Sequence, residues 1–382
     1  MSLRRAIIEA EPAAMNVSEF CREHGVSTWF FYDLRRRHRL EGDIVFEPKS
    51  RAAHRPAGRT PLEVEEAIVR CRKELDDAGW DSGPASIADG LAGLEGVPSE
   101  ATIWRILTAR GLIRASPSKA PKHTGRSWTA ERANECWALD DWTWTLADGT
   151  SVQILDVLDD HSRHAVACTA MPTCTSAASF DALADAAAQL GWPQRIWSDN
   201  GRAFTGALTT TLAHLGVAAS HTRPYSPASN GKVERFHQTV QRWLNKQSAA
   251  ATISELQAQL DLFRLHYNTR RPHRALARRT PTDVWTTAPK SGPADQPLAT
   301  PTTVHRSTIH NGGINTGRYQ IAVGAAHTGQ RAVTVITGTN AHVFINGRLI
   351  RHLTIDPTRR SQPIHPRPGR PTTTVREAPR HA

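Results

Sequence analysis

Apolar side chains recur at helical spacing in two blocks that precede the middle of the chain. Residues 17–37 read as two short helices joined by a tight turn, with the second helix opening at Ser27. Residues 61–113 repeat this pattern of short amphipathic helices separated by turn residues. The periodicity therefore predicts two small helical domains, at 1–50 and 58–113.

The middle of the chain alternates short strand-like runs with amphipathic helices. The first three strand-like runs are joined by turn residues, which predicts antiparallel hairpins. The order β-β-β-α-β-α-β-α then predicts a mixed sheet flanked by helices. The expected elements are strands at 137–146, 151–158 and 164–170, a helix at 176–190, a strand at 195–198, a helix at 206–215, a strand at 217–221, and helices at 231–247 and 253–267.

The helix expected at 231–247 has an informative register. Its apolar residues fall on one stripe at a helical period, namely Val233, Phe236, Val240, Trp243 and Leu244. Glu234 lies beside that stripe, on a polar face one turn into the helix, where it can face the sheet. A solvated glutamate favoured by the helix dipole is the structural alternative.

Strand signals return after a linker expected at 287–300. Asn346-Gly347 is a strong two-residue hairpin turn. Strands are expected at 318–323, 331–337 and 341–345. We expect a small β-barrel at 301–356, followed by a Pro- and Arg-rich tail at 357–382 that is disordered when free.

Charge changes the picture of what this chain contacts. The 382 residues include 47 Lys and Arg against 36 Asp and Glu, a formal net charge of +11. The surplus, together with a basic linker at 114–130, predicts nucleic acid as a partner, although a basic surface that binds nothing has the same composition. The five cysteines form no Cys-x-x-Cys pair, so we expect neither disulfides nor structural zinc. No apolar run is long enough to span a membrane, and a cytoplasmic, nucleoid-associated protein is expected.

Three acidic residues carry the candidate chemistry. Asp140 lies in a Trp-rich apolar run on an expected strand, Asp199 ends a short strand, and Glu234 lies on the helix that follows. Carboxylates from such elements can converge on hard divalent cations, which take oxygen ligands. Two such cations can clamp the attacking and leaving oxygens of a phosphodiester.

The sequence around these residues resembles that of bacterial insertion-sequence transposases, whose Asp-Asp-Glu catalytic core is related to that of retroviral integrases. The resemblance covers about 134–285, and the separation of Asp199 from Glu234 is near that of the family. The matching segments are Trp137-x-x-Asp140 with Trp144, Leu158-Asp-Asp-His-Ser-Arg163, Ser198-Asp-Asn-Gly201, Asn230-Gly-Lys-Val-Glu-Arg-Phe236 and Tyr267-Asn-Thr-Arg-Arg-Pro-His-Arg-Ala-Leu276.

One departure from the family concerns the first aspartate. The family usually has an apolar or small residue and then Thr after it, whereas Asp141 and Trp142 follow Asp140 here. Adjacent strand residues point to opposite faces, so only one of the two aspartates can face the metals. The spacings to Trp137 and Trp144 favour Asp140.

The resemblance implies a multidomain α+β protein with N-terminal helix-turn-helix domains, a ribonuclease H-like α/β core with a mixed five-stranded sheet at 131–286, and the small C-terminal β-barrel. It implies that Asp140, Asp199 and Glu234 hold two Mg²⁺, with Mn²⁺ able to substitute. The implied activity is that of a DNA transposase, with 3′-end cleavage and strand transfer. The implied partners are double-stranded DNA, as element terminal inverted repeats and target, and further copies of this chain, as a dimer or tetramer on DNA. A catalytically silent DNA-binding regulator and a ribonuclease H-like nuclease are the alternatives.

Candidate DNA contacts come from the helical domains, the basic linker and the core. In a helix-turn-helix the second helix enters the major groove while basic residues hold phosphates, although any αα-hairpin has the same pattern. In the core, the segment around His273 could equally fasten a helix by side-chain hydrogen bonds. The candidates are Ser27, Thr28, Arg35, Arg36, Arg37, Thr102, Arg105, Arg110, Lys119, Lys122, Lys232, Arg235, Arg270, Arg271 and His273.

Overall fold

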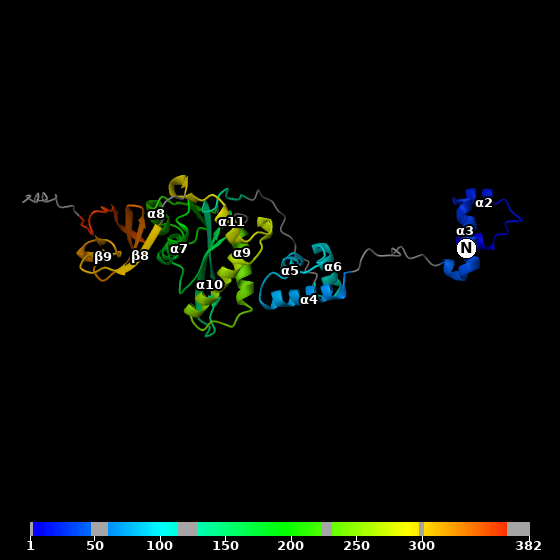
Figure 1. Cartoon of the computed structure of the whole chain (residues 1–382), viewed down its shortest axis with the longest axis horizontal. Helices are drawn as coiled ribbons and strands as arrows, with labels where there is room; N and C mark the ends of the chain where they lie inside the picture. Colours follow the sequence, from blue (N-terminus) through cyan, green and yellow to red (C-terminus); the bar gives the residue numbers. More distant parts are fainter. Residues whose placement is uncertain (1–2, 47–59, 114–127, 223–230, 298–301, 365–382) are drawn as a thin grey trace, which may run out of the picture. The chain divides into compact units, whose positions relative to one another are not determined.

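The computed structural model describes residues 3–46, 60–113, 128–222, 231–297 and 302–364. The chain divides into two compact units, residues 1–61 and residues 62–382, whose elements are labelled in Figure 1. The described helices include none long and apolar enough to cross a membrane. All five cysteines are free thiols, as the sequence predicts.

The N-terminal unit is a small helical body. Its helices are α1 (Leu3–Glu9), α2 (Val17–Glu23) and α3 (Thr28–Glu41), followed by a 3-10 helix (Gly42–Phe46). Ser27 caps α3, because its hydroxyl accepts a hydrogen bond from the Phe30 N–H at 3.1 Å. The two predicted helices and their turn are therefore present, and their role in reading DNA stays a prediction.

A second helical region opens the larger unit. It comprises α4 (Leu62–Asp77), α5 (Pro84–Gly90) and α6 (Glu100–Ala109). Ile68, Ile87, Ile103 and Leu107 form its buried centre. The α4–α5 loop joins this region to the rest of the unit, because Trp80 lies in the same apolar cluster as residues of the central sheet.

The centre of the larger unit is a five-stranded mixed sheet in the order β3-β2-β1-β4-β5. β1 pairs antiparallel with β2 and parallel with β4, β2 pairs antiparallel with β3, and β4 pairs parallel with β5. This is the mixed sheet expected from the sequence. The strands are β1 (Cys136–Thr145), β2 (Ser151–Asp159), β3 (Ala165–Met171), β4 (Arg195–Ser198) and β5 (Ala218–His221).

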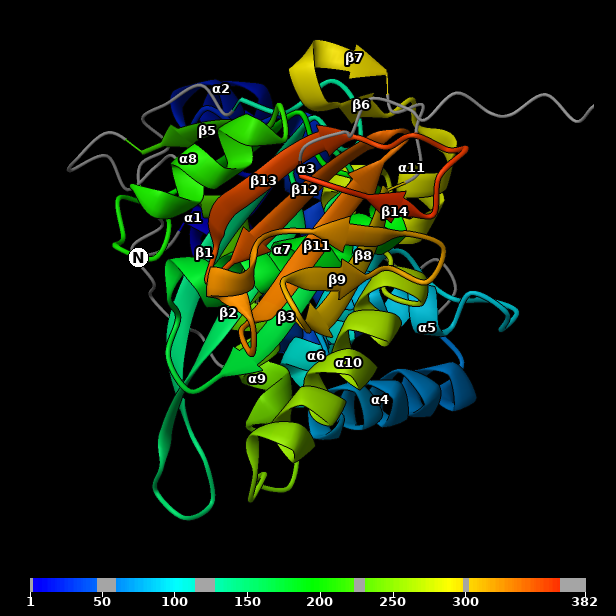
Figure 2. The same ribbon diagram turned by 90° about the vertical axis from the view of Figure 1, so that its left-hand side faces the viewer.

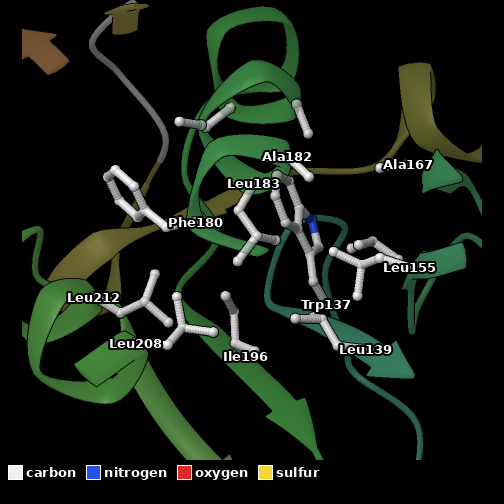
Figure 3. Packing of buried hydrophobic residues seen from close by; sticks show 14 of the residues in the cluster. Trp137, Leu139, Leu155, Ala167, Phe180, Ala182, Leu183, Ile196, Leu208 and Leu212 are labelled. Atoms are coloured by element: carbon white, nitrogen blue, oxygen red, sulfur yellow. The ribbon is translucent and has the colours of Figure 1, made fainter. Parts of the chain in front are cut away.

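Helices cover both faces of this sheet. On one face, α7 (Ser176–Leu190) and α8 (Ala207–His214) bury the cluster around Trp137 and Phe180 (Figure 3). On the other face, α9 (Gly231–Leu244) and α10 (Ile253–Thr269) pack on β1, β2 and β3 (Figure 2). The predicted apolar stripe of α9 is buried against this second face. The stripe consists of Val233, Phe236, Val240, Trp243 and Leu244.

Within the described residues, three further sheets follow α11 (Pro281–Thr287). Their orders are β13-β12-β11-β8, β14-β10-β9 and β6-β7, and the predicted small β-barrel is not confirmed. Asn346 and Gly347 have φ of 49° and 71°, as the predicted hairpin turn requires. The strands are β6 (Ser291–Gly292), β7 (Gln296–Pro297), β8 (Thr302–Thr308), β9 (Gly313–Asn315), β10 (Gln320–Ala322), β11 (Arg331–Thr337), β12 (Asn340–Ile345), β13 (Arg348–Thr354) and β14 (Ser361–Gln362).

These C-terminal strands are attached to the central sheet region. Phe344 lies in the apolar cluster under α7, with its ring 4.6 Å from that of Phe180. Arg306 donates to the Asp181 carbonyl oxygen at 2.8 Å and also pairs with Asp185. The expected linker at 287–300 contains β6 and β7, so it is not wholly irregular.

The expected disordered tail is wrong for its first residues. β14 pairs parallel with β10, and Gln362 is buried. The Arg351 guanidinium donates to the Gln362 carbonyl oxygen at 3.0 Å. This hydrogen bond gives a partner to a backbone carbonyl group that the composition of the tail predicts to be hydrated. Residues 365–382 lie outside the described residues.

Candidate active site

The parallel pairing of β1 with β4 sets Asp140 beside Asp199. Ala138 is the register partner of Trp197. Each aspartate lies two residues beyond one member of that pair, Asp140 within β1 and Asp199 directly after the carboxyl end of β4. Asp199 follows β4 directly and is exposed, whereas the Asp140 side chain is 22 % exposed. The pairing thus brings together two carboxylates that lie far apart in the sequence.

Strand alternation separates Asp140 from its rival Asp141. Ala138 and Trp142 share the face of Asp140, and both pack in the cluster under α9. Asp141 points to the opposite face, where it accepts a hydrogen bond from the Gln153 amide at 2.9 Å. Asp140 therefore faces the helix that carries Glu234, as the Trp spacings predict.

Glu234 enters from the first turn of α9, where it is exposed. His237, one turn further along the same face of α9, places Nδ1 3.5 Å from Asp140 Oδ2. Side chains three residues apart on a helix are neighbours. Glu234 therefore lies one helical turn from the residue of α9 that approaches Asp140.

The charge at this end of the sheet is concentrated. The pKa of Asp141 is raised, first by burial and then by the negative charges of Asp140 and Asp199. Within the described residues, no three His, Cys, Asp or Glu side chains are gathered closely enough to hold a metal ion. The residue types nevertheless suit hard divalent cations, because such cations prefer carboxylate oxygens.

The Ser198-Asp-Asn-Gly201 turn holds the Asp199 carboxylate. Asp199 Oδ1 accepts the Gly201 N–H at 2.8 Å, and the Asn200 amide donates to the Thr222 carbonyl oxygen at 2.8 Å. A Cβ on Gly201 would lie 2.9 Å from Asp199 Oδ1. Glycine is thus needed here for close approach to the carboxylate.

Lys232, a predicted DNA contact, is engaged inside the protein. Its ammonium binds both carboxylate oxygens of Asp160 at 2.7 and 2.8 Å and the Trp128 carbonyl oxygen at 2.7 Å. Burial lowers the Lys232 pKa, and the Asp160 hydrogen bond opposes this. The lysine therefore ties the start of α9 to the turn after β2. Asp159 holds that turn, because its carboxylate accepts the Ser162 N–H at 2.8 Å.

Other candidate DNA contacts also have internal partners, including Arg37 with Glu41 and Thr102 with Arg105. The Arg35 guanidinium donates to three backbone carbonyl oxygens at the end of α1 and just beyond it, and Arg271 pairs with Asp81. His273 caps a 3-10 helix, and burial lowers its pKa to about 4. Lys119 and Lys122 lie outside the described residues. The exposed candidates are Ser27, Thr28, Arg36, Arg105, Arg110, Arg235 and Arg270, and the DNA contacts all stay predictions.

Sequence reasoning missed two features near the site. Asp156 lies directly opposite Asp140 on β2 and is fully buried. A lone aspartate within an apolar strand could have identified it from the sequence. The Asp81 carboxylate on the α4–α5 loop pairs with both Arg242 and Arg271 of the core. No local pattern identifies such a contact, because its partners lie far away in the sequence.

Comparisons with known proteins agree with this architecture. Residues 130–227 and 215–281 each match the integrase core domain family. The chain is 28% identical over 167 residues to the uncharacterized 31.7 kDa protein of insertion element IS407 from Burkholderia multivorans, covering 44% of this chain and 60% of that protein. It is 25% identical over 210 residues to transposase InsD of insertion element IS2 from Escherichia coli, covering 50% and 67%.

A chain of the simian T-cell lymphotropic virus intasome in complex with PP2A regulatory subunit B56 gamma is 20% identical, with a TM-score of 0.38, over 72% of this chain and 96% of that one. The alignment with the IS407 protein spans less than two thirds of that relative. The two family matches fall on the strands and helices that carry Asp140, Asp199 and Glu234. This chain is therefore similar to insertion-element proteins, among them a transposase, and its residues 130–281 match the integrase core domain family.

Proposed function

We propose that this protein is a DNA transposase that binds the ends of an insertion element, cleaves their 3′ ends and joins them to target DNA. The observation that supports the proposal is the parallel register of β1 with β4, in which Asp140 within β1 and Asp199 after β4 each lie two residues beyond the pair of Ala138 and Trp197. The family match and the insertion-element relatives support it.

Asp140, Asp199 and Glu234 would hold two Mg²⁺ ions. When bound, the ions supply Lewis acidity at the attacking and leaving oxygens of the phosphodiester. The chain itself orients the scissile phosphate, so that a water and then the freed 3′-hydroxyl attack phosphorus in line at one place. Arg235, exposed beside Glu234, offers a guanidinium to the phosphates of the bound strand.

An open groove of about 760 Å³ leads from α6 to α9 and suits a DNA path. Its lining is rich in arginine and includes the exposed indole of Trp104. Arginines neutralise backbone phosphates, and aromatic faces accept stacked bases. The arginines are Arg72, Arg235, Arg242, Arg271, Arg274 and Arg278. Arg242 and Arg271 pair with Asp81, and Arg278 pairs with Asp89, so Arg235 and Arg274 are the arginines of this groove that we expect to meet phosphates first. The groove would connect a helix that reads the element end with the residues that cut it. Because two element ends must be bridged, at least two copies of the chain are expected on DNA.

The test uses the purified full chain with labelled duplexes that carry candidate element ends and Mg²⁺. We expect 3′-end nicking and joined products from the natural protein. Asp199→Asn and Glu234→Gln should bind the ends with nearly unchanged affinity and fail to cut. Asp140→Asn and Asp141→Asn, compared side by side, identify the first ligand, and only the former should abolish cutting.

Other outcomes would contradict the proposal in distinct ways. Tight end binding without any cutting under Mg²⁺ or Mn²⁺ would indicate a regulator. Cutting of RNA–DNA hybrids without preference for element ends would indicate a nuclease. If the Glu234→Gln variant joined DNA ends at the rate of the natural protein, Glu234 would not be a catalytic residue.

A further inference from the structure

A histidine of α9 lies between two aspartates of the sheet. His237 Nδ1 is 3.5 Å from Asp140 Oδ2, and its Nε2 is 3.7 Å from Asp156 Oδ2. Asp156 is the direct register partner of Asp140 in the antiparallel pair of β1 and β2. The three side chains thus form a row of carboxylate, imidazole and carboxylate that runs from the candidate metal site into the interior.

Asp156 is an unusual residue to find at the inner end of this row. Its side chain is 0 % exposed, and a buried carboxylate costs free energy unless polar partners compensate it. Burial raises its pKa to about 6, while His237 and the Trp142 hydrogen bond oppose this shift. An apolar residue would fill the strand position without that cost. The carboxylate therefore calls for a role beyond packing.

Trp142 closes the arrangement from the same strand face as Asp140. Its indole N–H donates to Asp156 Oδ2 at 2.9 Å. Its ring meets the His237 imidazole edge to face, with centroids 4.7 Å apart and planes at 71°. The His237 side chain is only 13 % exposed, so both its ring plane and its position are restricted by neighbours.

We infer that His237 is a positioning residue that holds the Asp140 carboxylate toward the metal site, and that Asp156 anchors His237 from behind. The inference rests on the proposed function of Asp140 as a metal ligand. A carboxylate at ion-pair distance behind an imidazole restricts the position of the ring, and groups that orient a metal ligand typically change metal affinity about 10- to 100-fold. Asp140 is the ligand so oriented, because it lies on the other side of the ring.

The test measures Mn²⁺ affinity of the full chain without DNA, by calorimetry and by electron paramagnetic resonance of free Mn²⁺. His237→Ala should weaken binding about 10- to 100-fold with little change in the melting temperature. His237→Asn should retain more affinity than alanine, since its amide nitrogen can occupy the place of Nδ1. Asp156→Asn should weaken binding in the same direction. Gln238→Ala, an exposed neighbour on α9, is the matched control and should bind as the natural protein does.

The outcomes separate this inference from the proposed function. If Asp140→Asn weakens Mn²⁺ binding and His237→Ala does not, the positioning role is overturned and the metal site stands. If Asp140→Asn leaves the affinity unchanged, the proposed site itself fails. Pulsed resonance that detects a histidine nitrogen bonded to Mn²⁺ would also overturn the inference, because His237 would then be a ligand. If Asp156→Asn does not fold, the His237 variants decide the question.

Discussion

Trp80→Ala should release the second helical region from the core while leaving both folded. Trp80 is 9 % exposed, and its ring stacks on those of His266 and Phe263 at 4.1 and 5.4 Å. A buried tryptophan covers roughly 200 Å², which at about 25 cal/mol per Å² corresponds to ~5 kcal/mol. Measured truncations of buried tryptophan cost about 3–5 kcal/mol. Because Trp80 belongs to the loop between α4 and α5, this loss falls on the contact between the two regions.

The assay is hydrogen exchange resolved by peptide, combined with guanidinium unfolding. In Trp80→Ala, amides of the α4–α5 loop and of the facing part of α10 should exchange about 100-fold faster or more, as a loss of at least ~3 kcal/mol implies. Trp104→Ala is the matched control, since that indole on α6 is 50 % exposed and its loss should leave exchange unchanged. Equal protection in the natural protein and Trp80→Ala would refute the reasoning. If the reasoning holds, the Trp80→Ala variant should also cut DNA without a fixed position relative to the bound element end.

Three further predictions concern single side chains. The Arg36 side chain is 66 % exposed, so Arg36→Ala should reduce the slope of end-binding affinity against salt concentration by about one unit in a salt titration. Arg35→Ala should instead lower the free energy of unfolding by at least about 2 kcal/mol in denaturant unfolding. Gly201→Ala should displace the Asp199 carboxylate and slow cutting at least about tenfold with stability changed by less than about 0.5 kcal/mol; cutting at the natural rate would contradict this. Burial lowers the pKa of His164 to about 4, below the value of about 6.5 of the unfolded chain. The unfolded state therefore binds more protons between these values, and stability should fall as pH drops from about 6.5 to 4, by up to about 1.4 kcal/mol per unit. His164→Gln should flatten that slope in denaturation at several pH values.

Much of the fold could be predicted because its elements carry local periodicity. The helix at 176–190 and the strand at 195–198 begin and end as expected. The stripe of α9 is buried as its register implies, since burial of an apolar face decides the orientation of a helix. The order of strands and helices along the chain predicted a mixed sheet, whereas the strand order β3-β2-β1-β4-β5 comes from the structure. The C-terminal strands were only partly predicted, because β8 and β13 mix polar and apolar residues without clear alternation.

The candidate site was also predictable only in part from the sequence. Asp140, Asp199 and Glu234 were singled out from their local contexts, and Asp140 was preferred over Asp141 because of its spacings to Trp137 and Trp144. Asp156 was missed and His237 was left unassigned, because their significance arises only where β2 and α9 meet β1. The motif residues mark a site, whereas the residues that orient them can come from any neighbouring element.

The sequence by itself determined the elements, the acidic residues and the basic character of the chain, since these depend on local pattern and composition. Only the tertiary structure decided which charges face solvent and which serve the fold. Arg35 and Arg36 are adjacent arginines on one helix, yet the first binds carbonyl oxygens at the end of α1 and the second is exposed. Lys232 looks like a DNA contact in sequence and is tied to Asp160 in space. The physical reason is that a charged side chain takes the partner that packing brings within hydrogen-bond distance, and that partner is set by distant parts of the chain.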